Sequence, residues 1–120
     1  MKYMLMIYNN AAALDELPDA ELETIMDEVD ALMEELQASG ELVGGQALAD
    51  AATARTVRVR GGVPAVTDGP FAESKEQLAG YLIVDCETEE RAVEIATRWP
   101  DARYWAMEVR PIMHTSGTEM

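Results

Sequence analysis

The sequence predicts an α+β fold in which strands and helices follow in the order β-α-β-β-α-β, with one hairpin inserted. Three observations predict it: an apolar strand opens the chain, two stretches have helical periodicity, and alternating segments lie between and after them. Two helices on one face of an antiparallel sheet is the expected layering. The 120 residues fit one domain over residues 1–113, with a flexible tail at 114–120.

The first two elements are an apolar strand and a long helix. Residues 2–8 are apolar at both odd and even positions, which predicts a strand covered on both faces. Residues 15–39 predict an amphipathic helix with Pro18 in its first turn and Gly40 ending it. Its apolar stripe recurs at three- and four-residue steps: Leu22, Ile25, Met26, Val29, Leu32, Met33 and Leu36.

The middle of the chain predicts short strands and a hairpin. Residues 41–48 form a strand in which Gly44-Gly45 indicates a bulge or a close backbone approach. Residues 53–60 alternate in polarity, Gly61-Gly62 is a turn signal, and residues 63–67 return as the hairpin partner.

Two strands and a helix complete the predicted order. Asp68-Gly69-Pro70-Phe71 is a turn, and residues 72–78 form at most one helical turn. Residues 79–86 favour a strand, residues 88–99 a helix that Thr88 caps and Pro100 ends, and residues 104–112 the last strand.

Charge and cysteine content exclude several classes of protein. The formal net charge is −14, so nucleic-acid binding and anionic membrane surfaces are disfavoured. Ten acidic residues lie between Asp15 and Glu35, whereas Arg55, Arg58 and Arg60 cluster later. A lone cysteine, Cys86, forms no intrachain disulfide, which fits the cytoplasm. The apolar start is too short to span a bilayer.

The Asp-Gly-Pro-Phe turn is the first candidate site. Asp68 is a candidate general base or ligand-binding carboxylate, Phe71 a candidate pocket wall, and Lys75 a candidate anion contact. The structural alternatives are a tight turn in which Asp68 caps backbone N–H groups and Phe71 anchors the loop, and a solvated charged run around Lys75.

The second candidate site is a set of charged residues predicted on the sheet face without helices: Arg58, Arg60, Glu108 and Arg110. Arginines enclosed there would bind a carboxylate or phosphate through two hydrogen bonds, or form salt bridges between subunits. Tyr8 and Tyr81 are candidate hydroxyl donors near strand ends. The only histidine, His114, lies in the tail, so no metal site and no cofactor are predicted.

Four segments carry a resemblance to a known family. They are the opening strand at residues 1–8, TARTVRVRG at 53–61, TDGPFAESKEQLAGY at 67–81 and EVRPI at 108–112. These segments resemble the DGPF-domain proteins of the YCII-related family. The resemblance implies a ferredoxin-like fold, a homodimer that forms a dimeric α/β barrel, and a genomic association with sigma factors. It implies no established activity, and the His-Asp pair of related proteins is not matched here.

Three functions follow as hypotheses. The first is binding of a small polar or anionic metabolite in a cleft beside Asp68, with Arg58, Arg60, Phe71, Lys75, Tyr81 and Arg110 as ligand contacts. The second is a metal-free enzyme with Asp68 as base. The third is a regulatory partner that docks through the acidic helix.

Overall fold

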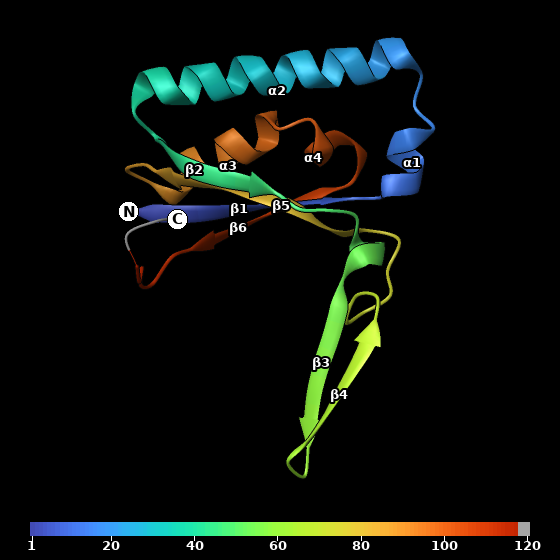
Figure 1. The fold of residues 1–120 in the computed structure, drawn as a ribbon. Coiled ribbons are helices and arrows are strands. Elements are labelled where there is room, and N and C mark those ends of the chain that lie inside the picture. Colours follow the sequence, from blue (N-terminus) through green and yellow to red (C-terminus); the bar gives the residue numbers. More distant parts are fainter. Residues whose placement is uncertain (118–120) are drawn as a thin grey trace.

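The computed structural model describes residues 1–117 and contains a four-stranded sheet, a separate hairpin and helices on one side of the sheet (Figure 1). The strands are β1 (Lys2–Asn9), β2 (Leu42–Ala47), β3 (Arg55–Arg60), β4 (Val63–Asp68), β5 (Gln77–Asp85) and β6 (Ala106–Pro111). The helices are α1 (Ala11–Asp15), α2 (Asp19–Ser39), the 3-10 turn η1 (Ala51–Thr53), α3 (Glu89–Arg98) and α4 (Asp101–Tyr104).

The sheet has the strand order β2-β5-β1-β6, and every pair is antiparallel. The helices α2, α3 and α4 lie on one side of it, and among residues 1–117 the other side carries no helix (Figure 1). The β3–β4 hairpin is a sheet of its own that projects away from α2, past the uncovered side. The predicted α+β class is confirmed, and the arrangement is compatible with a ferredoxin-like fold.

The core lies between the helices and the sheet. The side chains of Tyr3, Leu5 and Ile7 are buried on the helical side of β1, and they alternate with the half-buried Met4 and Met6. This alternation corrects the prediction that β1 is covered on both faces, because within one chain only its odd-numbered face is buried. The uncovered face therefore keeps an apolar strip at its centre.

Helix boundaries differ from the predictions where proline and asparagine act as caps. The helix predicted over residues 15–39 begins only at Asp19, as α2, because Pro18 occupies its N-cap, and the short helix α1, capped by the Asn10 side chain, was not predicted. The predicted helical turn at 72–78 is absent, and β5 begins at Gln77. Pro100 ends α3 but also starts α4, since proline is tolerated where a helix begins, and this delays the last strand to Ala106.

The two glycines of β2 act as predicted. The register of β2 against β5 shifts between Leu42 and Gly44, which is a bulge. A Cβ atom on Gly45 would lie 2.6 Å from the carbonyl oxygen of Tyr81, so the strands approach closely there. Within residues 1–117, no helix combines the length and apolarity that crossing a bilayer requires. Residues 114–117 of the predicted tail form no helix or strand, and the rest of the tail lies outside the described residues.

Candidate functional site

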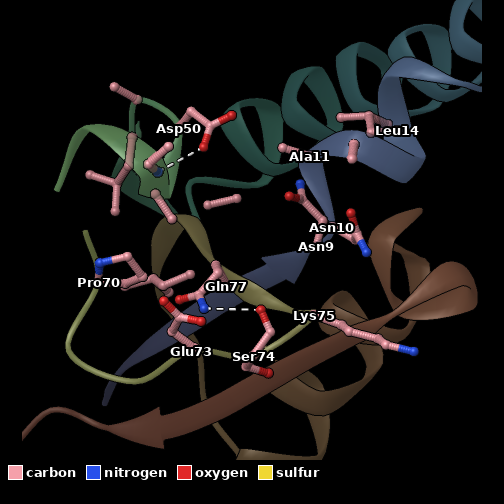
Figure 2. Close-up of a pocket in the computed structure, with 17 residues that line it drawn as sticks. Asn9, Asn10, Ala11, Leu14, Asp50, Pro70, Glu73, Ser74, Lys75 and Gln77 are labelled. Carbon is pink, nitrogen blue, oxygen red and sulfur yellow. Dashed lines mark hydrogen bonds between the residues drawn. The ribbon is translucent and has the colours of Figure 1, made fainter. Parts of the chain in front are cut away.

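A polar cavity lies at the foot of the hairpin, where the chain leaves β1 and β2 and enters β5. Its volume is about 670 Å³, within the usual range for small-molecule sites. Figure 2 shows that three segments surround it: α1 with its cap, the η1 turn, and the loop between β4 and β5. Its polar lining residues are Asn9, Asn10, Asp50, Glu73, Ser74, Lys75 and Gln77.

Two of the polar residues are held by capping a helix. The Asn10 side chain accepts a hydrogen bond from the Ala13 N–H at 3.0 Å, and Asp50 Oδ1 accepts one from the Ala52 N–H at 2.8 Å. Each uses only one of its side-chain polar atoms in this way, so the Asn10 amide nitrogen and the second Asp50 oxygen keep their hydrogen-bonding capacity.

Asn9 lies at the end of β1 and is held by a buried acid. Its Nδ2 donates to Oδ2 of Asp101 at 3.0 Å, and Asp101 is only 9% exposed. This bond orients the Asn9 amide and supplies a partner to a carboxylate that burial would otherwise disfavour.

The loop between β4 and β5 is anchored at both ends. The Gly69 N–H donates to the Ala54 carbonyl at 2.7 Å, and the Thr56 hydroxyl donates to the Gly69 carbonyl at 2.9 Å. Gln77 Nε2 donates to the carbonyl oxygens of Ala72 and Ser74. Glycine is needed at position 69 for its φ of +95°, whereas an added Cβ would meet open space, so backbone conformation and not close packing requires it.

The cavity carries charges of both signs. Asp50 and Glu73 contribute carboxylates, and Lys75 contributes the cation. The Lys75 ammonium forms no hydrogen bond or salt bridge with any residue of the described range 1–117. Its side chain extends away from Pro70 and Glu73 (Figure 2). The wall therefore favours ligand groups that donate hydrogen bonds, and the Lys75 ammonium lies at the rim of the cavity.

The Asp-Gly-Pro-Phe turn is divided between the cavity and the surface. Pro70 lines the cavity, but Asp68 and Phe71 do not. Asp68 Oδ1 lies 3.3 Å from Arg55 Nε, and the Asp68 side chain is 89% exposed. The Phe71 ring is exposed and stacks on the guanidinium of Arg58, whose Cζ is 4.8 Å from the ring centroid. Phe71 therefore neither walls this cavity nor anchors the loop in the core.

The predicted group of arginines is not brought together on one sheet. Arg58 and Arg60 belong to β3 of the separate hairpin, whereas Arg110 lies in β6 at the edge of the four-stranded sheet. The strand predicted over residues 53–60 and its hairpin partner at 63–67 are present as β3 and β4, but the sequence did not indicate that they form a sheet of their own. Tyr81 lies in β5 opposite Met6 of β1 and does not line the polar cavity.

The uncovered sheet face does carry the predicted Tyr8 and Glu108. The Tyr8 hydroxyl donates to Glu108 Oε1 at 3.1 Å. Burial, and then the bond to Glu108, raise the pKa of the Tyr8 hydroxyl above its ordinary value. Both groups are therefore engaged with each other rather than with a ligand in the single chain.

Known proteins are similar to this chain over nearly its whole length. A model of the YCII-related domain matches residues 1–116. The chain belongs to the YCII-related family. An uncharacterized protein of Rhizobium meliloti (strain 1021) is 32% identical to it over 114 residues, which is 93% of this chain and 92% of the relative. The matched region includes the hairpin, the β4–β5 loop and the cavity at the foot of the hairpin.

This YCII-related protein has a second cavity of about 520 Å³ between α2 and the sheet. Its lining is mostly apolar. Leu22, Ile25 and Val29 of α2 contribute to it, as do Leu82 of β5 and Trp99, which follows α3. It shares Asn9, Leu14 and Ala79 with the polar cavity, so the two adjoin.

The sequence did not reveal Asn9, Asn10, Asp50 and Gln77 as site residues of this YCII-related protein. Asn9-Asn10 stand at the end of β1 and Asp50 follows the end of β2 after a short connection, and asparagine or aspartate at such places is a local signal for caps and turns. Nothing in that signal brings the ends of β1 and β2 together with Gln77, because their proximity comes from the sheet order. Among residues 1–117, no group of three or more His, Cys, Asp or Glu is arranged to bind a metal ion.

Proposed function

We propose that this YCII-related protein binds a small polar metabolite in the cavity at the foot of the hairpin. The observation that carries the proposal is a cavity of about 670 Å³ with seven polar side chains on its wall, formed by segments that are each anchored by hydrogen bonds. Anchored walls lower the entropy lost when a ligand binds.

The charges of the wall favour one ligand class over another. Asp50 and Glu73 repel a multiply charged anion, while Lys75 attracts a single anionic group at the rim. We infer a zwitterionic or singly anionic ligand with several hydrogen-bonding groups, such as an amino acid or a hydroxy acid. A phosphate-rich ligand fits less well, because Arg58 and Arg60 lie on the hairpin rather than on the wall.

The proposal includes a homodimer in which a second copy covers the open sheet face, as in a dimeric α/β barrel. That face has Met4, Met6 and Ile83 at its centre and Glu108 and Arg110 on β6 beside them. A mostly apolar sheet face without helices is stabilised when another sheet packs against it. Cys86 is a buried free thiol, which accords with the cytoplasmic location proposed here.

The geometry supports the two alternative functions less well. Asp68 is an exposed carboxylate paired with Arg55 outside the cavity, which is not the environment of a general base. The acidic surface of α2 is partly used within the chain, since Glu28 pairs with Arg103 and Glu35 with Arg98.

A thermal-shift screen with amino acids, hydroxy acids and sugar phosphates tests the proposal. We expect at least one amino or hydroxy acid to raise Tm, because a ligand that binds only the native state stabilises it. Lys75→Met should then weaken binding of that compound by roughly tenfold, since one charge-assisted contact is lost. Isothermal titration calorimetry measures the change.

Arg60→Met is the matched control, because it removes a cation outside the cavity. We expect it to change the dissociation constant by less than twofold. If Lys75→Met and Arg60→Met lose the same amount of affinity, or if only Arg60→Met loses affinity, the ligand binds on the hairpin and the proposed site is contradicted.

A further inference from the structure

We propose that the β3–β4 hairpin is an arm that docks against a second copy of this chain. The inference rests on the homodimer included in the proposed function and adds a second contact to it. The arm comprises residues 55–68, which form a sheet separate from the main one. Four observations support this role: an apolar face, an isolated position, a charge opposite to that of the rest of the chain, and a favourable direction.

One face of the arm is apolar and exposed. Strand pairing places Val57 opposite Val66 and Val59 opposite Pro64, so these four side chains share a face. The side chain of Val57 is 63% exposed, and those of Val59 and Val66 are each 56% exposed. Such a contiguous apolar patch on an extended element indicates a contact with another surface.

Among residues 1–117, few contacts join the arm to the other helices and strands. It projects past the sheet, and its tip lies far from the helices (Figure 1). A two-stranded hairpin alone is at best marginally stable in water. The Gly61-Gly62 turn, with φ of +57° and +78°, favours the hairpin locally but adds no packing. A partner that covers the apolar face would supply the missing burial.

The net charge of the arm is opposite in sign to that of the rest of the chain. Arg55, Arg58 and Arg60 stand against one acid, Asp68, so the arm is net positive. The whole chain carries −14, and the remainder is therefore more acidic still. A second copy of this chain is attracted to the basic arm as a whole, although Arg58 and Arg60 lie on the face opposite the valines, and the valines then make the contact.

The direction of the arm matches the proposed interface. It extends on the side of the four-stranded sheet that carries no helix (Figure 1). A second copy seated on that face would lie beside the arm. The foot of the arm continues into the loop of residues 69–76, which supplies Pro70, Glu73, Ser74 and Lys75 to the polar cavity. Docking of the arm would therefore also restrain one wall of the ligand site.

Sedimentation velocity of the full chain over a concentration series tests the arm. Val57→Thr combined with Val66→Thr makes the apolar face polar while it keeps β-branched side chains that suit a strand. We expect the dimer dissociation constant to rise at least tenfold. Val63→Thr is the matched control, because Val63 is equally exposed at 67% but pairs with Arg60 on the opposite face. We expect it to leave the constant within about twofold of wild type.

Each other outcome has a distinct meaning. If the double variant dimerises as strongly as wild type, the proposed docking role of the arm is wrong, and the proposed dimer through the sheet face is unaffected. A wild-type chain that stays monomeric at all concentrations overturns both contacts, whereas the thermal-shift screen still tests ligand binding separately.

Hydrogen exchange tests the arm in the wild-type protein, so this test does not require that any variant folds. We expect the amides of residues 55–68 to be more protected in concentrated samples than in dilute ones. Exchange rates there that do not change with concentration, while the dimer fraction does, would also overturn the arm.

Discussion

Leu5→Ala is expected to lower the free energy of unfolding by about 3 kcal/mol or more, because it leaves a cavity in a well-packed core. Leu5 is in the central strand β1, and its side chain is fully buried among residues of α2, α3 and β5. Native domains are stable by only about 5–15 kcal/mol, so this loss is large. Urea unfolding followed by circular dichroism measures it.

Met4→Ala, one residue away, is the control for the alternation of β1. Met4 is on the uncovered face and is half-buried, so its truncation should cost well under half as much in monomer stability. Equal losses at the two positions would contradict the assignment of one buried and one uncovered face.

Glu41→Gln is expected to cost about 2 kcal/mol at pH 7, because it weakens two charge-assisted hydrogen bonds. Arg91 Nε and one terminal nitrogen each donate to a Glu41 oxygen at 2.8 Å. The two side chains are 28% and 18% exposed, so solvent screens this pair less than a surface one. Chemical unfolding of both proteins measures the difference.

The same pair predicts a dependence on pH. The Arg91 hydrogen bonds hold the pKa of Glu41 at about 2, below its usual 4.5. A lowered carboxyl pKa contributes stability that is complete above pH 4.5 and is lost as the pH falls toward 2. The stability difference between wild type and Glu41→Gln should therefore disappear over that interval.

Glu94→Gln is the control, since Glu94 pairs with the same arginine but is 62% exposed. We expect a change below about 0.5 kcal/mol at pH 7. A Glu94 effect as large as that of Glu41, or a Glu41 effect that does not vary with pH, would contradict this account of the pair.

Local chemistry was enough to predict most elements of the fold. The periodicity from Leu22 to Leu36 identified the long helix, Thr88 identified the start of α3, and Gly44-Gly45 identified the bulge of β2. Helix ends were less predictable, because Asn10 and Pro100 serve as caps only when the flanking chain turns there. The alternation in residues 55–60 indicated a strand but not its separate sheet.

The candidate site was predictable only in part. Lys75 and the Asp-Gly-Pro-Phe turn do lie at or beside the polar cavity, since Pro70 and Lys75 line it. The opposite wall comes from Asn9, Asn10 and Asp50, which are far apart in sequence from that turn. Pairing of β1 and β2 with β5 brings them together. The local amino-acid composition does not predict long-range strand pairing of this kind.

Amide chemical-shift mapping tests the central claim most directly. The compound that raises Tm most in the screen is titrated into isotope-labelled protein. We predict that shifts are concentrated at the cavity wall, in residues 9–12, 50–52 and 70–79. Shifts concentrated on the tip of the hairpin or on the uncovered sheet face, or no binding by any compound of the screen, would contradict the proposed site.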